Sequence, residues 1–218
     1  MKAKYSFLFI LMLLGCSKIK VLDNPLTELN EKPSKINISE YSKIKKQFNL
    51  KNVEDAPFYY NGLEPNYPIL LSRDFLGKST NNCFEVSGGI IAGCNNLVLK
   101  IDSTYILIDN KKIFDSYFLP INGEKEALSY VSIITETIPR YSFDVKFRYE
   151  TYVEQLNKSY AKKLNNGYEV LTYDYDSYGC GPHYYYSVKS FVDLKGNIKT
   201  IEKKRIYKDP DMDGLCVD

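Results

Sequence analysis

The sequence predicts an α+β fold in which an antiparallel β-sheet, arranged largely as a meander, carries one or two short helices. Two observations support this fold class. The last third of the chain contains runs of β-branched and aromatic residues separated by turn-forming Asn and Gly. Before it, apolar residues recur at helical spacing directly after Asn122-Gly123. We therefore expect a helix followed by a sheet in the C-terminal half.

The chain begins with a pattern typical of exported proteins. Lys2 and Lys4 precede the apolar run Phe7–Leu14, which is too short to remain in a bilayer as a spanning helix. The ending Leu13-Leu14-Gly15-Cys16 closely resembles the lipobox of bacterial lipoproteins. The resemblance implies that residues 1–15 are a signal peptide and that Cys16 receives a lipid. The alternative is an ordinary secretory signal with an incidental cysteine.

A lipidated Cys16 would hold the mature protein at the cell membrane through its lipid anchor. Ser17 stands where retained inner-membrane lipoproteins of enteric bacteria have an aspartate. The resemblance therefore favours the outer membrane, facing the periplasm or the cell surface. Residues 16–35, with Pro25, Pro33 and scattered charges, are expected to be a flexible tether. Residues 36–218 would form a single α+β domain, with a subdivision near residue 120 as the alternative.

The first expected elements of this domain are a helix and a strand. Residues Ser39–Phe48 fit a short helix capped by Ser39, with Ile44 and Phe48 on one face. A strand is expected at Tyr67–Phe75.

Three β-rich runs follow, and their spacing favours a meander. They are Leu97–Ile101, Thr104–Ile108 and Lys111–Phe114, separated by the turn-type pairs Asp102-Ser103 and Asp109-Asn110. Both faces of the middle run are largely apolar. We therefore expect the middle run to be a central strand.

A second helix is expected over Glu124–Glu136, where acidic residues crowd the first turn. Its apolar face would consist of Ala127, Leu128, Val131, Ile134 and Ile138. Pro139 would end it.

The C-terminal third predicts up to four antiparallel strands. Ser159–Leu164 and Tyr168–Tyr175 flank the hairpin turn Asn165-Asn166-Gly167. An alternating run from Tyr184 to Leu194 leads through Lys195-Gly196-Asn197 into Ile198–Tyr207. A helix followed by such strands is similar to the helix on a curled sheet of the cystatin and nuclear-transport-factor folds. This resemblance of element order implies a fold but no function.

The charge balance argues against a nucleic-acid partner. The chain has 29 Lys and Arg residues and 27 Asp and Glu residues, and Lys2 and Lys4 leave with the signal. The mature chain is therefore nearly neutral, whereas a nucleic-acid-binding domain is usually basic.

Four cysteines besides Cys16 suggest disulfides, since export leads to an oxidising compartment. Cys83, Cys94, Cys180 and Cys216 allow three pairings. We favour Cys83–Cys94 and Cys180–Cys216, because each pair lies within one local segment. A zinc site is the alternative, but no Cys-x-x-Cys spacing occurs.

The sequence offers little catalytic chemistry, and we predict no catalytic residue, no metal and no cofactor. The single histidine, His183, lies beside glycines, a proline and Cys180, which indicates a rigid loop rather than a general base. Asp209, Asp211 and Asp213 match the start of a calcium loop, but the acid that an EF-hand has at position twelve is missing. A plain turn before Cys216 is therefore the expectation.

Tyrosine is the unusual residue of this chain, with 20 copies and no tryptophan. Tyr178, Tyr184, Tyr185 and Tyr186 gather around Cys180 and would suit a protein or glycan partner if exposed. Strand propensity and core packing explain such tyrosines equally well.

The predicted function is a lipid-anchored, non-catalytic binding or structural module of the cell envelope. Two alternatives remain open. One is an immunity-type lipoprotein that neutralises a toxin. The other is an envelope enzyme that acts through carboxylates such as Glu169, Asp174 or Asp176, which would require a cleft with two acids.

Overall fold

The computed structural model describes residues 19–22, 29, 36–75, 83–87, 93–146 and 148–217. Within these ranges the chain is α+β, as the sequence predicts, with two five-stranded antiparallel sheets and three α-helices. Residues 1–15, predicted to be a signal peptide, and Cys16 lie outside the described residues.

The C-terminal sheet has the strand order β7-β13-β12-β10-β9. Two register shifts between β12 and β13, at Tyr185/Tyr186 and Lys189/Ser190, bend the strands, and the sheet curls into a half-barrel. Gly167 pairs with Leu164, so Asn165-Asn166 alone forms the turn of the expected hairpin. The strands are β7 (Glu150–Thr151), β9 (Tyr160–Leu164), β10 (Gly167–Tyr175), β12 (Tyr184–Asp193) and β13 (Ile198–Lys208).

The N-terminal sheet has the order β2-β3-β5-β4, and β6 also pairs with β5. Its strands are β2 (Glu54–Asp55), β3 (Ile69–Phe75), β4 (Glu85–Ser87), β5 (Gly93–Ile101) and β6 (Thr104–Ile108). A short 3-10 helix, η1 (Phe58–Tyr60), precedes β3.

The expectation that Thr104–Ile108 is a central strand is wrong. Among the described residues, β6 pairs only with β5. Its two faces are apolar because each is covered by a different cluster. Tyr105 packs with Ile44 of the first helix, whereas Ile108 belongs to the main core. Burial of both faces by other elements produces the same pattern as a central position.

The expectation of a third β-run at Lys111–Phe114 is also wrong, because this segment starts helix α2 (Lys111–Phe118). Asn110 is not a hairpin turn residue but the N-cap, and its side chain accepts a hydrogen bond of 2.9 Å from the Ile113 N–H. Phe114 and Phe118 are buried one helical turn apart.

Helix α1 (Ile38–Phe48) matches the predicted helix except at its cap. The N-cap is Asn37, not Ser39. Asn37 accepts from the Ser39 N–H at 3.0 Å, and the Glu40 carboxylate accepts from the Asn37 N–H at 3.2 Å. This reciprocal pair is a capping box, which fixes the start of the helix.

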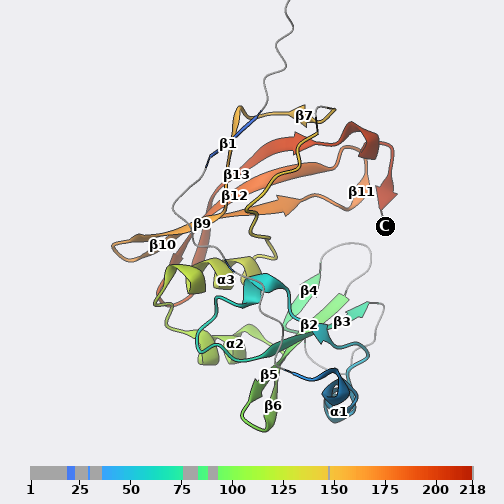
Figure 1. Cartoon of the computed structure of the whole chain (residues 1–218), viewed down its shortest axis with the longest axis vertical. Helices are drawn as coiled ribbons and strands as arrows, with labels where there is room; N and C mark the ends of the chain where they lie inside the picture. Colours follow the sequence, from blue (N-terminus) through green and yellow to red (C-terminus); the bar gives the residue numbers. More distant parts are fainter. Residues whose placement is uncertain are drawn as a thin grey trace, which may run out of the picture.

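Helix α3 (Glu124–Ile134) lies between the two sheets (Figure 1). Seven consecutive residues, Ala127–Ile133, are buried, so the helix is covered on all sides. One core cluster surrounds it and includes Leu97 and Ile108 of the N-terminal sheet together with Tyr168 and Val192 of the C-terminal sheet. The helix therefore packs on the curled sheet with one side and on the N-terminal half with the other.

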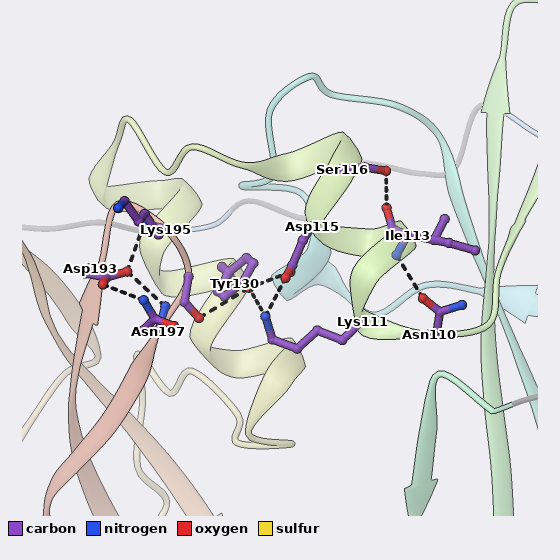
Figure 2. A network of polar contacts seen from close by, with 10 residues as sticks. Asn110, Lys111, Ile113, Asp115, Ser116, Tyr130, Asp193, Lys195 and Asn197 are labelled. Carbon is purple, nitrogen blue, oxygen red and sulfur yellow. Dashed lines mark hydrogen bonds and ion pairs between the residues drawn. The ribbon is translucent and has the colours of Figure 1, made fainter.

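A polar network joins α2, α3 and the β12–β13 turn (Figure 2). The Tyr130 hydroxyl donates to Asp115 Oδ1 at 2.7 Å and accepts from Lys111 Nζ at 2.8 Å. The Gly196 carbonyl oxygen lies 3.4 Å from the same hydroxyl. Burial and the hydrogen bond to Asp115 raise the pKa of Tyr130, so the phenol stays protonated.

The expected flexible tether, residues 16–35, contains an ordered strand. β1 (Lys20–Leu22) pairs in parallel with β8 (Gln155–Asn157). Leu29 is buried in the main core, and the neighbouring Ile36 is buried against α1. The tether prediction is therefore wrong for Lys20–Leu22 and Leu29, and the remaining residues of 16–35 apart from Ile19 lie outside the described part of the chain.

The described part of the chain contains two disulfides, and they are the pairings that the sequence favours. Cys83 is bonded to Cys94 with a Cα–Cα distance of 5.1 Å, and Cys180 to Cys216 with 4.1 Å. The second bond joins β11 (Gly179–Cys180) to β14 (Cys216–Val217). A 3-10 helix, η2 (Pro210–Met212), precedes β14.

Candidate binding surface

The four tyrosines predicted as a binding patch do not form one surface. Side chains alternate along a strand, so Tyr184 and Tyr186 share the face of β12 on which Val192 packs toward α3. Tyr185 lies on the opposite face. Tyr178 lies in the loop between β10 and β11, with 53% of its surface exposed. Only Tyr184 and Tyr186 can therefore meet one partner together on this face of the strand.

Tyr184 and Tyr186 belong to a row of side chains that we call the tyrosine–cation ladder. Its members are Tyr152, Tyr184, Tyr186, Lys203 and Arg205. The Arg205 guanidinium carbon lies 4.2 Å from the ring centroid of Tyr184, and Lys203 Nζ lies 4.7 Å from that of Tyr186. Tyr152 meets Tyr184 edge to face at 5.9 Å. These are cation–π and T-shaped contacts, which hold the side chains in place.

The ladder follows from the register of the β12–β13 hairpin. Arg205 pairs directly with Tyr186, and Lys203 pairs with Val188, two residues further along β12. Each cation can therefore reach a ring diagonally across the two strands. Because both strands belong to a five-stranded sheet, the ladder is built on a rigid support.

Acidic residues flank the ladder at both ends. Lys203 Nζ lies 2.6 Å from Asp174 Oδ2, and the Tyr152 hydroxyl donates to Glu150 Oε1 at 2.6 Å. This hydrogen bond, together with burial, raises the pKa of Tyr152 to about 12. The hydrogen bond with Tyr186 raises the pKa of Arg205. In the described part of the chain Arg205 has no carboxylate partner, so its charge is available to a ligand.

Tyr185 belongs to a separate tyrosine stack on the other face of the sheet. Its ring stacks on Tyr175 at 4.2 Å and on Tyr207 at 4.6 Å, and Tyr207 stacks on Tyr149 at 5.6 Å. Arg140 lies 5.1 Å from the Tyr185 centroid. Tyr207 is buried, and burial raises its pKa to about 12. Packing of these rings with their neighbours makes this stack part of a small core rather than an exposed patch.

His183 holds two loops together. The ring is 2% exposed, its Nδ1 lies 2.9 Å from the Asp176 carbonyl oxygen, and its Nε2 lies 3.1 Å from that of Leu215. The Asp176 oxygen lies in the segment before Cys180 and the Leu215 oxygen directly before Cys216, so the ring bridges the two segments that the disulfide joins. The His183 ring therefore has a structural role: it links the β11 loop to the C-terminal segment.

The Asp209–Gly214 loop has its carboxylates opposite cations. Arg148 lies 2.7 Å from Asp209 and 2.6 Å from Asp211, and Lys208 lies 2.5 Å from Asp213. Burial alone would raise the pKa of Asp209, but the hydrogen bond from Arg148 lowers it overall. Among the described residues no group of three or more potential metal ligands is present. The loop is a turn fixed by ion pairs.

The three carboxylates proposed for an envelope enzyme are not brought together as a pair. Asp174 lies beside Lys203, whereas the Glu169 side chain accepts a hydrogen bond of 2.8 Å from the Tyr160 hydroxyl. Asp176 uses its backbone carbonyl for His183. Glu136, which the sequence did not single out, does lie near Asp174: burial, and then the charge of Asp174, raise its pKa.

Sequence reasoning missed three of the five ladder residues, namely Tyr152, Lys203 and Arg205. For Lys203 and Arg205, the sequence signal that could have found them is their alternate spacing along β13, opposite the tyrosines of β12. The register shift at Lys189/Ser190 determines that Arg205 faces Tyr186 and Lys203 faces Val188, and the amino-acid pattern does not contain that shift.

Comparison with protein-family models, with curated proteins and with solved structures finds no match to this chain. Within the described ranges, no helix has both the length and the apolar character needed to cross a bilayer.

Proposed function

We propose that this chain is a lipid-anchored lipoprotein of the cell envelope that acts as a non-catalytic binding module. The basic start, the apolar run and the lipobox-like ending at Cys16 support the anchor. Two disulfides are in keeping with an oxidising compartment outside the cytoplasm. The outer membrane, with the domain in the periplasm or at the cell surface, is the proposed location.

The observation that carries the binding role is the tyrosine–cation ladder. Tyr and Arg are the residues enriched at the energetic centres of interfaces, because they combine large contact area with directed polar groups. Here Tyr184, Tyr186 and the exposed Arg205 are held on two strands, and Tyr152 beside them is 40% exposed. A guanidinium that already stacks on a tyrosine can offer its N–H groups to a carboxylate at little further cost in ordering.

The proposed partner is a protein surface that carries carboxylates and an apolar or aromatic centre. Arg205 supplies positive charge without a carboxylate partner among the described residues, Lys203 adds a cation that is shared with Asp174, and Tyr184 and Tyr186 supply flat contact area. An acidic glycan would meet the same groups and is the alternative ligand.

The test compares capture of partners by ladder variants in native envelopes. The lipidated protein would be cross-linked in intact cells as the wild type and as the variants Arg205→Ala and Tyr184→Ala. Tyr178→Ala is the matched control, because Tyr178 is exposed but lies outside the ladder. We expect a cross-linked product that falls at least tenfold in both ladder variants and is unchanged in Tyr178→Ala. An equal yield in all four proteins would contradict the role of the ladder.

A further inference from the structure

The distance along the chain from Cys16 to the folded body is very short. β1 starts at Lys20, whose N–H donates to the Glu154 carbonyl at 3.1 Å, and ends at Leu22, whose carbonyl accepts from the Lys158 N–H at 3.3 Å. Ile19 is three residues after Cys16. Three residues span at most about 11 Å, even when fully extended. A lipid on Cys16 therefore holds Ile19 within about this distance of the membrane surface.

β1 lies on one particular face of the C-terminal sheet. Residues Tyr152–Asn157, the strap, cross the sheet on the side of Leu171, Lys189 and Lys204. Helix α3 packs on the opposite side, against Tyr168 and Val192. Figure 1 shows the consequence: β1 lies at one end of the long axis of the molecule, whereas α1 and β6 lie at the other end. We call the side with β1 and the strap the strap face.

The strap face exposes groups that suit a lipid interface. Val21 is 42% exposed, Leu22 39% and Tyr152 40%. Aromatic and apolar side chains of this kind are favourable at headgroup depth. Beside them lies a groove of about 450 Å³, lined in part by Ile19, Lys20 and Tyr152.

A second groove, of about 600 Å³, continues under the strap and carries charge. Lys189 and Lys204 line it, and in the described part of the chain neither ammonium group has an ion-pair partner. Glu154 and Glu202 line the same groove. A site with both signs of charge fits a ligand that itself carries a phosphate and an ammonium group, as a zwitterionic phospholipid headgroup does.

We propose that the strap face lies against the leaflet that holds the Cys16 lipid, and that a phospholipid headgroup enters the groove with its phosphate between Lys189 and Lys204. This inference rests on the proposed lipid anchor. The short link brings the face to the membrane, and the groove fixes its orientation. The four ladder residues of β12 and β13, Tyr184, Tyr186, Lys203 and Arg205, lie on the opposite face of the sheet and are then directed away from the leaflet, toward a partner. Tyr152, which lines both grooves and also meets the Tyr184 ring, belongs to the strap.

The absence of tryptophan from the chain makes the orientation measurable. Val21→Trp places one fluorophore on β1, and Ile38→Trp places one at the start of α1, where Ile38 is 76% exposed. Each lipidated protein would be reconstituted into phosphatidylethanolamine–phosphatidylglycerol vesicles that contain nitroxide-labelled headgroups. We expect the Val21→Trp emission to fall by at least half and the Ile38→Trp emission to stay unchanged. Equal quenching of the two probes, or stronger quenching of Ile38→Trp, would overturn the orientation.

A second pair of variants tests the groove. In the Val21→Trp background, Lys189→Ala/Lys204→Ala should weaken the quenching at least twofold. Lys46→Ala/Lys112→Ala, which removes two exposed lysines from α1 and α2, should leave it unchanged. Equal quenching in both double variants would refute the headgroup site.

The quenching experiment distinguishes a wrong orientation from a missing lipid anchor. A chain without lipid on Cys16 stays in the aqueous phase, and then neither tryptophan is quenched. A lipidated chain that binds the vesicles but keeps Val21→Trp bright refutes the orientation alone.

Discussion

Glu136 is the residue whose conformation fits its side chain least. It has a φ of 54°, in the left-handed region, directly after the C-cap of α3. The Thr137 N–H donates to the Ser132 carbonyl at 3.1 Å and the Glu136 N–H to that of Ile133 at 3.5 Å, which is the Schellman pattern. Glycine is the usual residue at this position, because a Cβ is unfavourable there. The carboxylate adds a second, smaller cost: partial desolvation and the charge of Asp174 raise its pKa, but the residue is exposed and solvent screens the effect.

We therefore expect two separable gains in stability at this position. Glu136→Gln removes the charge, so it should stabilise the fold at pH 7. A raised pKa means that the wild-type penalty is present above the folded pKa and absent once the carboxyl is protonated. The gain should therefore vanish below the ordinary glutamate pKa of about 4.3.

Compared with Glu136→Gln, Glu136→Gly should raise the free energy of unfolding by about a further 0.5–1 kcal/mol at every pH, because glycine adopts the left-handed backbone without strain. Urea unfolding at pH 7 and pH 3 measures both variants. A Glu136→Gly protein less stable than Glu136→Gln would show that the φ value carries no strain.

At the scale of elements, the β12–β13 turn depends on its approach to α3. Gly196 has a φ of 77°, and a Cβ there would lie 2.3 Å from the Tyr130 hydroxyl. Gly179 has a φ of 86°, but a Cβ there would meet nothing within 4 Å. Both glycines therefore adopt a positive φ that disfavours other residues, but only at Gly196 would a side chain also collide with a neighbour.

Gly196→Ala should lower the free energy of unfolding by about 1–3 kcal/mol more than Gly179→Ala does. The added methyl group at position 196 would also displace Tyr130 from Asp115 and Lys111. Thermal unfolding of the two variants side by side gives the comparison. Equal losses would mean that the network of Figure 2 can shift without cost.

The Cys180–Cys216 bond is expected to stabilise the fold more than Cys83–Cys94. The two bonds close loops of 36 and 11 residues. The loop-entropy model gives about 4 and about 3 kcal/mol for loops of these lengths. Around the longer loop, β11 and β14 pair over only two residues each, with His183 beside them. Without the bond, residues Leu215–Val217 would keep only this short pairing and the His183 contact, while ion pairs would still hold the Asp209–Gly214 turn.

Cys180→Ser/Cys216→Ser should therefore lower the urea midpoint more than Cys83→Ser/Cys94→Ser does. Hydrogen exchange should also increase at Leu215 and at position 216 in the first variant. The reverse order of midpoints would contradict the expectation.

Elements with complete local signals were predictable, and elements defined by their neighbours were not. The β9–β10 hairpin follows from Asn165-Asn166, and α3 from its apolar spacing. In contrast, Lys111–Phe118 has residues that suit either state, and the decision rests on the Asn110 cap and on packing of Phe114 against the core. The strand β1 could not be recognised, because its partner β8 lies more than a hundred residues away.

Only part of the candidate site could be predicted, because the rest of it is also defined by a neighbouring strand. Tyr184 and Tyr186 stood out by composition, but their cations come from the neighbouring strand. The register shift at Lys189/Ser190, between the β12–β13 turn and the ladder, decides that Arg205 faces Tyr186. Tyr185 could not be separated from its neighbours without knowing that the sheet buries a second cluster on its other face.

At the scale of the whole molecule, the curled sheet separates two roles. One face holds α3 and, beyond it, the ladder residues of β12 and β13, and the other holds the strap with Tyr152, β1 and the short connection to Cys16. An anchor on one side and a recognition surface on the other is a coherent arrangement for a lipoprotein that presents a partner site away from its membrane. The orientation of the two faces relative to the membrane depends on the proposed lipid at Cys16.

The intact mass of the mature protein, purified with detergent from native envelopes, tests that dependence most directly. We predict a chain that starts at Cys16 and carries the added mass of a diacylglyceryl group, and a Cys16→Ser variant that moves to the aqueous phase. A mature chain that starts at another residue, or an unmodified Cys16 in a protein that still partitions with the membrane, would contradict the account.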